Sequence, residues 1–179
     1  GELLQIEKAR RLDISEEVYF DIITKKTATL IASCCATGAK AANQNVETVE
    51  RMRLFGEKVG ICFQIKDDLF DYGSGEDIGK PSGIDIKEKK MTLPLIHALS
   101  QAPKRERRKI INTVKNNNND DKKVQEVINF VLQSGGIQYA SEKMYAYRDE
   151  ALSILNEFPE NEARESLKNL VLFTTERKK

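Results

Sequence analysis

The stretch of the chain best suited to chemistry is Gln64–Tyr72, in which three aspartates fall within five residues. On a helix Asp67 and Asp71 are four residues apart and Asp68 and Asp71 are three apart, so all three share one face. Carboxylates at this spacing repel one another, and more strongly when partly buried. A hard divalent cation, Mg²⁺ above all, would offset the repulsion, because it takes oxygen ligands and keeps positions for water and substrate phosphates.

The aspartates close a long apolar helical pattern, which predicts a helix from about 46 to 72. Acidic residues at a helix C-terminus oppose the macrodipole, so their placement favours a functional cause over a stabilising one. A solvated acidic helix end is the simpler alternative. An EF-hand is a poor alternative, because the residues from Asp71 to Gly75 lack alternating oxygen ligands.

A long loop over residues 73–91 follows the aspartates and carries Lys80 and Lys90. Loops of this length in a compact domain are usually functional or disordered. Carboxylates with nearby lysines suit a diphosphate that is held through a metal, with the lysines neutralising the remaining charge.

The elements around this stretch are predicted to be helical. Ser15 is a good N-cap for a helix from about 16 to 42. Gly56 and Gly60 would each cost about 1 kcal/mol in a helix interior, which predicts a close neighbour there. Shorter helices are expected over residues 93–101 (capped by Thr92), 104–116, from 120 or 121 to 133, 137–158 and 161–175, with a helix end over 2–11. No strand alternation is found, so the fold class is all-α, with the two long helices central.

Composition limits the function classes. The chain has 179 residues, with 29 Lys and Arg against 28 Asp and Glu, so bulk charge does not point to nucleic acid or an anionic membrane. Cys34, Cys35 and Cys62 lie in apolar helical contexts and are expected to be reduced, buried thiols of a cytoplasmic protein. His97 is the only histidine and is expected to be structural. No apolar run in the sequence is long enough to span a membrane, and no signal peptide is expected.

Several ordered motifs resemble the second aspartate-rich region of trans-polyprenyl diphosphate synthases. They are Phe63-Gln64-Ile65-x-Asp67-Asp68-x-x-Asp71-Tyr72, Gly79-Lys80-Pro81-x-Gly83-x-Asp85 and Lys90-x-Thr92-Leu93-Pro94. Lys26-Thr27 is similar to the Lys-Thr motif of that family. Gly1-Glu2-x-x-Gln5 is similar to a stretch of its medium- and long-chain members, such as octaprenyl diphosphate synthases, and the basic end 176–179 resembles the family's C-terminus.

The resemblance implies the C-terminal part of the isoprenoid synthase helical bundle, with residues 1–179 forming one domain. It implies a prenyltransferase that condenses isopentenyl diphosphate with an allylic diphosphate through Mg²⁺-assisted ionisation. By motif, Asp67 and Asp68 would be the nearest Mg²⁺ ligands, and Asp71 would act directly or through water. A homodimer is expected, and no nucleic acid.

Substrate-binding and catalytic residues follow from the same resemblance. Lys26, Lys80 and Lys90 would bind the allylic diphosphate, and Thr27 and Gln64 would face the reacting carbons as dipoles. The terminal Arg177 and Lys179 would either contact isopentenyl diphosphate or form an exposed tail. The basic run 104–109 is expected to be a solvated helix face, with docking to a membrane surface as the alternative.

Two departures from the family pattern matter. Lys89 replaces the glycine that precedes the family's Lys-x-Thr-Leu-Pro stretch. The first aspartate-rich motif has no match, since Asp13 and Asp21 stand alone. We therefore expect the C-terminal half of a synthase, with half of the metal site missing and little turnover by itself. The alternative is a non-catalytic helical subunit or interaction module. A terpene cyclase is disfavoured by Gly79-Lys80 and by the stretch from Lys90 to Pro94.

Overall fold

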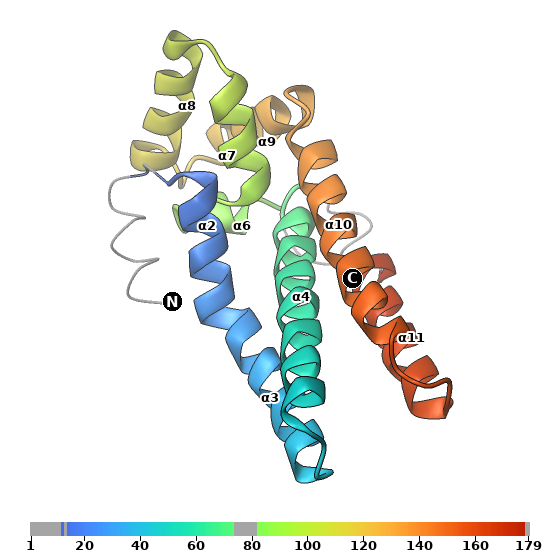
Figure 1. The fold of residues 1–179 in the computed structure, drawn as a ribbon. Coiled ribbons are helices and arrows are strands. Elements are labelled where there is room, and N and C mark those ends of the chain that lie inside the picture. Colours follow the sequence, from blue (N-terminus) through green and yellow to red (C-terminus); the bar gives the residue numbers. More distant parts are fainter. Residues whose placement is uncertain (1–11, 13, 74–81, 178–179) are drawn as a thin grey trace. The chain divides into compact units, whose positions relative to one another are not determined.

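The computed structural model describes residue 12, residues 14–73 and residues 82–177, and these residues form helices and turns without a strand (Figure 1). The all-α prediction is confirmed. The elements are α2 (Glu16–Ile23), the π-helix η1 (Thr24–Ala28), α3 (Thr29–Ala41), α4 (Val46–Phe70), α6 (Ile84–Lys87), α7 (Leu93–Gln101), α8 (Lys104–Asn116), α9 (Asp121–Gln133), α10 (Gly136–Asn156) and α11 (Glu162–Glu176).

The helices pack as two compact units. The first unit holds Ile23–Lys66 and Glu142–Arg177, which are η1, α3, most of α4, most of α10, and α11. The second unit holds the described residues up to Ile22 together with Asp67–Ser141. The prediction of one domain over residues 1–179 stays a prediction.

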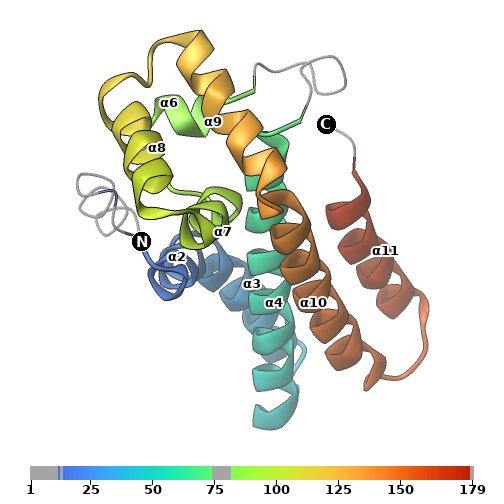
Figure 2. The ribbon, with the colours of Figure 1, turned by 90° about the horizontal axis from the view of Figure 1, so that it is seen from above.

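In the first unit, two glycines allow α4 to pack closely against the preceding helices (Figure 1, Figure 2). A Cβ on Gly60 would lie 2.5 Å from the Cα of Ala28, and a Cβ on Gly56 would lie 2.8 Å from the carbonyl oxygen of Ile31. Real Cβ atoms do not approach backbone atoms so closely, so any larger residue would force the helices apart. The close neighbour that was predicted from these glycines is confirmed.

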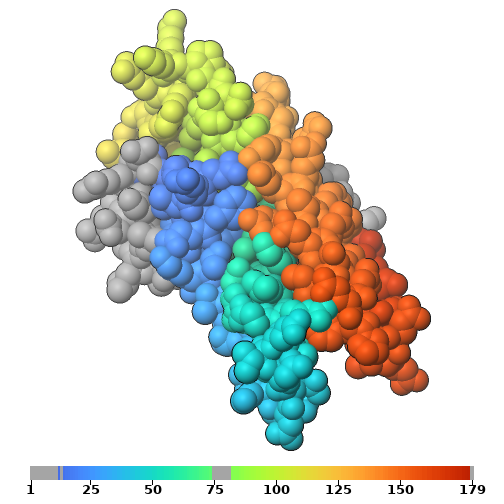
Figure 3. Space-filling model, viewed as in Figure 1, coloured from blue at the N-terminus to red at the C-terminus, as the bar shows by residue number. Residues whose placement is uncertain are grey.

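The same unit buries a core between α4, α10 and α11. Phe55, Ala151, Leu155 and Val171 form a buried cluster with exposed fractions of 3% or less. Lys58 of α4 forms an ion pair of 2.6 Å with Glu150 of α10, and Arg51 pairs with Glu157. Figure 3 shows the outer surfaces of α4 and of the α10–α11 pair side by side.

In the second unit, α6 to α9 surround a separate core. Its fully buried side chains come from all four helices and are Ile86, Leu93, Leu95, Val114, Val127 and Val131. Part of this region differs from the prediction. The expected loop over 73–91 contains the short helix α6, and Thr92 does not cap α7 with its side chain. Instead, the Thr92 hydroxyl lies 2.6 Å from the hydroxyl of Tyr72, and both residues are buried.

The predicted helix 16–42 is also interrupted, because the backbone changes from α to π geometry at Thr24–Ala28. The predicted cap is present, since the N–H of Val18 donates to Ser15 Oγ at 3.3 Å. Of the three cysteines only Cys62 is buried, while Cys34 is exposed and Cys35 half-buried. The expectation of three buried thiols was therefore wrong for Cys34. Within the described ranges, no helix is both long and apolar enough to cross a membrane.

Candidate functional site

The acidic end of α4 lies in the second unit, where a tyrosine holds one of its carboxylates. The Tyr19 hydroxyl on α2 donates to Asp68 Oδ2 at 2.7 Å, across a sequence separation of 49 residues. Both residues are buried, with exposed fractions of 4% and 6%. Burial, followed by the nearby charge of Asp68, raises the pKa of Tyr19 well above its usual value. The phenol therefore stays protonated and fixes the rotation of the Asp68 carboxylate.

Asp71 is held by the backbone of α6. Its Oδ1 accepts from the N–H of Ile84 at 2.8 Å and its Oδ2 from the N–H of Asp85 at 3.2 Å. Its carbonyl oxygen accepts from the N–H of Gly83 at 2.9 Å. Gly83 has φ +82°, a conformation that side-chain-bearing residues rarely adopt, and a Cβ there would also lie 2.4 Å from Val124 Cγ1. The chain thus turns at Gly83 and aims two amides at Asp71.

Burial, followed by the charge of Asp85, raises the pKa of Asp71 to about 6, although the backbone hydrogen bonds act in the opposite direction. A carboxylate with both oxygens already engaged by amides is less available to a cation. Through these hydrogen bonds, Asp71 links the end of α4 to the start of α6.

Lys90 lies in the same unit and is bound by acidic neighbours. Its ammonium group forms ion pairs with Asp85 at 3.1 Å and Glu88 at 2.6 Å. Burial works to lower the pKa of Lys90, but the two carboxylates outweigh it and raise the pKa. The ammonium is therefore fully charged near neutral pH, and a phosphate that bound it would compete with these two carboxylates.

Thr27 and Gln64, the two side chains predicted to act as dipoles, are hydrogen-bonded in the first unit. Thr27 Oγ1 donates to Gln64 Oε1 at 3.0 Å, and both side chains are half-buried. Thr27 lies in the π-helix η1 together with Lys26, which is exposed. Single turns of π-helix occur often at functional sites, because the extra residue shifts side chains relative to a regular helix.

The end of α11 contributes a cation to the first unit. The guanidinium of Arg177 lies 4.6 Å from the ring centre of Phe63 on α4. Burial, followed by the positive charge of Arg177, lowers the pKa of Lys66. Of the remaining predicted residues, Lys80 and Lys179 lie outside the described part of the chain.

The residues at the end of α4 fit a hard divalent cation by donor type, since all three are carboxylates. In residues 14–73 and 82–177, however, no three acidic, histidine or cysteine side chains are arranged to hold a metal ion. Tyr19 occupies one oxygen of Asp68, and the α6 amides occupy both oxygens of Asp71. Asp71 therefore fits a directly bound cation poorly as it stands, and the ligand set of Asp67, Asp68 and Asp71 stays a prediction.

Tyr19 is the residue that sequence reasoning missed. It precedes the Lys-Thr motif by one to two helical turns and carries no local signature of a functional role. Its partner lies on another helix, so only the tertiary fold reveals the contact. Asp85, by contrast, has its partner nearby in the sequence, since its Oδ1 accepts from the ammonium of Lys90 at 3.1 Å.

Known proteins resemble this chain in sequence. The sequence model of the polyprenyl synthetase family matches residues 1–131. Among curated proteins, the chain is 36% identical over 178 residues to heptaprenyl diphosphate synthase component 2 of Geobacillus stearothermophilus. It is 30% identical over 178 residues to octaprenyl diphosphate synthase of Escherichia coli. These matches cover 99% of this chain and 54% and 55% of the relatives.

Solved structures agree with the sequence comparison. Geranylgeranyl pyrophosphate synthase from Bacteroides thetaiotaomicron superposes with a TM-score of 0.91 at 38% identity, covering 99% of this chain and 59% of the other. Polyprenyl synthase from Caulobacter crescentus CB15, crystallised with calcium and isoprenyl diphosphate, gives 0.90 at 32% identity, covering 100% and 55%.

The fold is therefore that of the all-helical isoprenyl synthases. With the family model matching most of its length, the chain belongs to the polyprenyl synthetase family. It spans about half the length of the curated relatives it matches.

Proposed function

We propose that this chain takes part in prenyl transfer, in which an allylic diphosphate ionises and its carbocation is attacked by the double bond of isopentenyl diphosphate. The observation that carries the proposal is the fixed acidic end of α4. Asp68 is buried and oriented by Tyr19, and Asp71 is buried and oriented by the α6 amides. Both residues fall within the matched family region.

The charge balance of the reaction suits these residues. The carbon–oxygen bond breaks with its electron pair leaving on the diphosphate, a carbon–carbon bond forms, and one proton is lost. Mg²⁺, when bound, would supply the charge that draws off the diphosphate. Asp67 and Asp68 would hold it, Lys26, Lys80 and Lys90 would bind the diphosphate, and the Thr27–Gln64 pair would present fixed dipoles to the reacting carbons.

The same proposal covers the divalent cation, the substrates, the assembly state and the cellular location. Calcium and isoprenyl diphosphate are present in the solved structure of the Caulobacter relative, which supports a divalent cation and a prenyl diphosphate for this chain too. We further propose a cytoplasmic homodimer, with Arg177 and Lys179 contacting isopentenyl diphosphate.

Binding of a non-reactive prenyl bisphosphonate tests the proposal by calorimetry with and without Mg²⁺. We expect binding that requires Mg²⁺ and weakens at least tenfold in Asp68→Asn. Asp149→Asn is a matched control, because Asp149 is an exposed aspartate in the first unit. Binding that needs no Mg²⁺, or that survives in Asp68→Asn as well as in the control, would contradict the proposal.

Tyr19→Phe tests how the carboxylate is positioned. Mutation of a residue that hydrogen-bonds to a metal ligand and orients it typically lowers metal affinity by about 10–100-fold. We expect Mn²⁺ affinity, followed by electron paramagnetic resonance without substrate, to fall about tenfold. Tyr145→Phe is the control, because Tyr145 is exposed on α10. Unchanged Mn²⁺ affinity in Tyr19→Phe would remove Tyr19 from the site.

A second candidate function is a non-catalytic helical subunit of a larger synthase. The chain spans about half the length of its relatives, and one of them is named as a component of a synthase. The 179 residues carry one aspartate-rich motif, whereas ionisation is expected to use two, so we expect little turnover by the chain alone. Rapid turnover of isopentenyl and allylic diphosphates by the chain alone would overturn this second candidate.

A further inference from the structure

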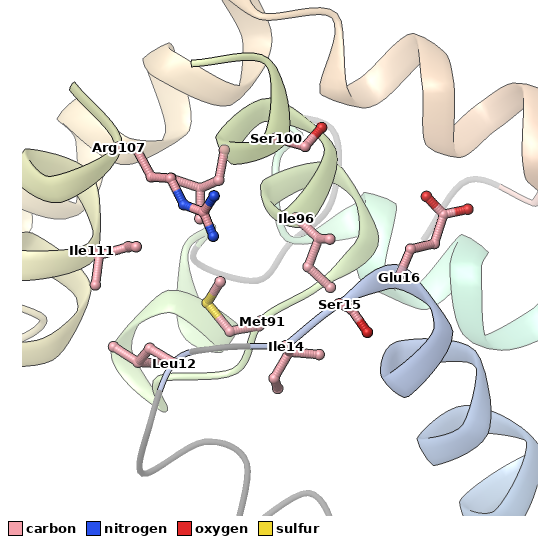
Figure 4. Close-up of a pocket in the computed structure, with 10 residues that line it drawn as sticks. Leu12, Ile14, Ser15, Glu16, Met91, Ile96, Ser100, Arg107 and Ile111 are labelled. Carbon is pink, nitrogen blue, oxygen red and sulfur yellow. The ribbon is translucent and has the colours of Figure 1, made fainter. Parts of the chain in front are cut away.

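The second unit contains a pocket of about 260 Å³ that involves none of the aspartates (Figure 4). It lies among the N-terminal end of α2 with the residues before it, the second half of α7 together with Met91, and α8. Its apolar lining consists of Leu12, Ile14, Met91, Ile96, Leu99 and Ile111. This volume is close to the lower end of the roughly 300–1,000 Å³ that small-molecule sites occupy, so it suits a small ligand.

One cation points into this pocket. Figure 4 shows the Arg107 guanidinium extending from α8 over Met91 and toward Leu12. The acidic residue at the pocket, Glu16, is directed away from Arg107 in the same view. Both carboxylate oxygens of Glu16 lie 2.8 Å from the hydroxyl of Tyr139, which donates to them. Among the described lining residues, the charge that faces the apolar surface is therefore positive.

The first turns of α8 add further positive charge around Arg107. Lys104, Arg105, Arg107 and Arg108 are exposed, and none has a side-chain hydrogen bond or ion pair with any residue of the chain for which the structure gives a position. Lys109, in contrast, pairs with Glu126 at 3.5 Å. The α8 N-cap, Pro103, offers no side-chain hydrogen bond to the first amides of the helix.

The position of these cations at the N-terminus of α8 is unfavourable for the helix itself. Cations near a helix N-terminus oppose the macrodipole by about 0.3–1 kcal/mol each at an exposed site. Among the described residues that line the pocket, Arg107 is the cation, and the first turn of α8 also carries the acidic Glu106. An apolar pocket directly beneath one of these cations adds a place for a hydrocarbon chain.

From this arrangement we propose that the pocket binds a small anionic amphiphile, with its acid group on Arg107 and its aliphatic tail on Met91, Ile96 and Leu99. The acid can be a carboxylate or a phosphate monoester, since a guanidinium binds either in the same way. The site is independent of the prenyl-transfer proposal, because it uses no aspartate and needs no Mg²⁺.

Titration of the isotope-labelled full chain with octanoate, in the presence of a chelator, tests this site by nuclear magnetic resonance. We expect amide shifts at α7 and α8 and not at α4. Between butanoate and octanoate, each added CH₂ should strengthen binding by up to about fourfold while it finds apolar surface. Octyl phosphate should bind at the same residues, and octylamine should not.

Variants separate the head and tail contacts. Arg107→Gln should weaken octanoate binding at least fivefold, whereas Lys115→Gln, an exposed cation in the last turn of α8, should leave it within twofold. Ser100→Phe, which fills the pocket from an exposed position, should remove the dependence on chain length. Equal binding of octylamine, or no octanoate binding with Arg107-dependent binding to phosphatidylglycerol vesicles, would overturn the pocket, the latter in favour of a membrane surface.

Discussion

Two helix ends in the second unit carry charge of the sign that the helix dipole disfavours, and the chain treats them in opposite ways. At the C-terminus of α4, Asp68 and Asp71 are buried and held by Tyr19 and by the amides of α6. At the N-terminus of α8, Lys104 and Arg105 are exposed and have no partner among the described residues.

The carboxylates at the end of α4 are held in a fixed orientation before any ligand binds, whereas the cations at the start of α8 can change orientation to suit a ligand. A carboxylate whose rotation is fixed by internal donors presents an oxygen in one direction, which suits a ligand of defined geometry. Unpaired cations on flexible stems attract an anion without fixing its orientation. Substitutions should therefore cost stability at the end of α4 and cost none at the start of α8.

The largest effect is expected for Asp71→Ala. This change leaves the part-buried N–H groups of Ile84 and Asp85 without their acceptor, and an unsatisfied backbone donor costs about 1–3 kcal/mol when fully buried and less where water reaches it. We expect the free energy of unfolding in urea to fall by about 2–4 kcal/mol. Asp71→Asn keeps one acceptor oxygen and should lose less than half as much. Equal losses in the two variants would contradict the role of Asp71 as an amide acceptor.

The pH dependence of stability gives a smaller effect from the same residue. The pKa of Asp71 rises from its usual 3.8 to about 6 in the folded chain, so the folded state binds more protons than the unfolded state between these values. The contribution of Asp71 therefore falls as pH rises from about 4 to about 6 and is restored on acidification.

The difference between wild type and Asp71→Asn isolates this contribution. We expect the stability difference to change by on the order of 2 kcal/mol between pH 4.5 and 7.5, with wild type gaining toward acid. Urea unfolding in the presence of a chelator measures it without a bound metal. A difference that does not vary with pH would show that Asp71 titrates normally.

The sequence was sufficient to predict most of the helices. Hydrophobic spacing gave α7 and α8 with their observed bounds, because their periodicity is uninterrupted and prolines precede or begin them. Gly56 and Gly60 correctly indicated a close helix contact, since glycine in a helix interior has a cost that calls for a compensating approach.

The residues that orient the candidate site could not be predicted in the same way. The Tyr19–Asp68 hydrogen bond joins two residues that lie 49 positions apart in the sequence, on different helices. Nothing in the local pattern of either helix specifies it. The π turn at Thr24–Ala28 lies inside a stretch whose apolar spacing predicted one uninterrupted helix. Thr92 looked like a cap, but its hydroxyl bonds Tyr72, because a buried phenol needs a hydrogen-bond partner.

The smallest effect, and the one of opposite sign, is expected at the start of α8. Lys104→Glu replaces an unpaired cation in the first turn with an anion, which the helix dipole favours there, so the free energy of unfolding should rise by about 0.3–1 kcal/mol. Lys115→Glu makes the same change of charge in the last turn and should lower stability by a similar amount. Both residues are exposed, so packing does not differ between the two variants. If Lys104→Glu lowered stability as much as Lys115→Glu, a contact of Lys104 would be holding the folded chain together, and the start of α8 would resemble the end of α4 in having its charge fixed from within.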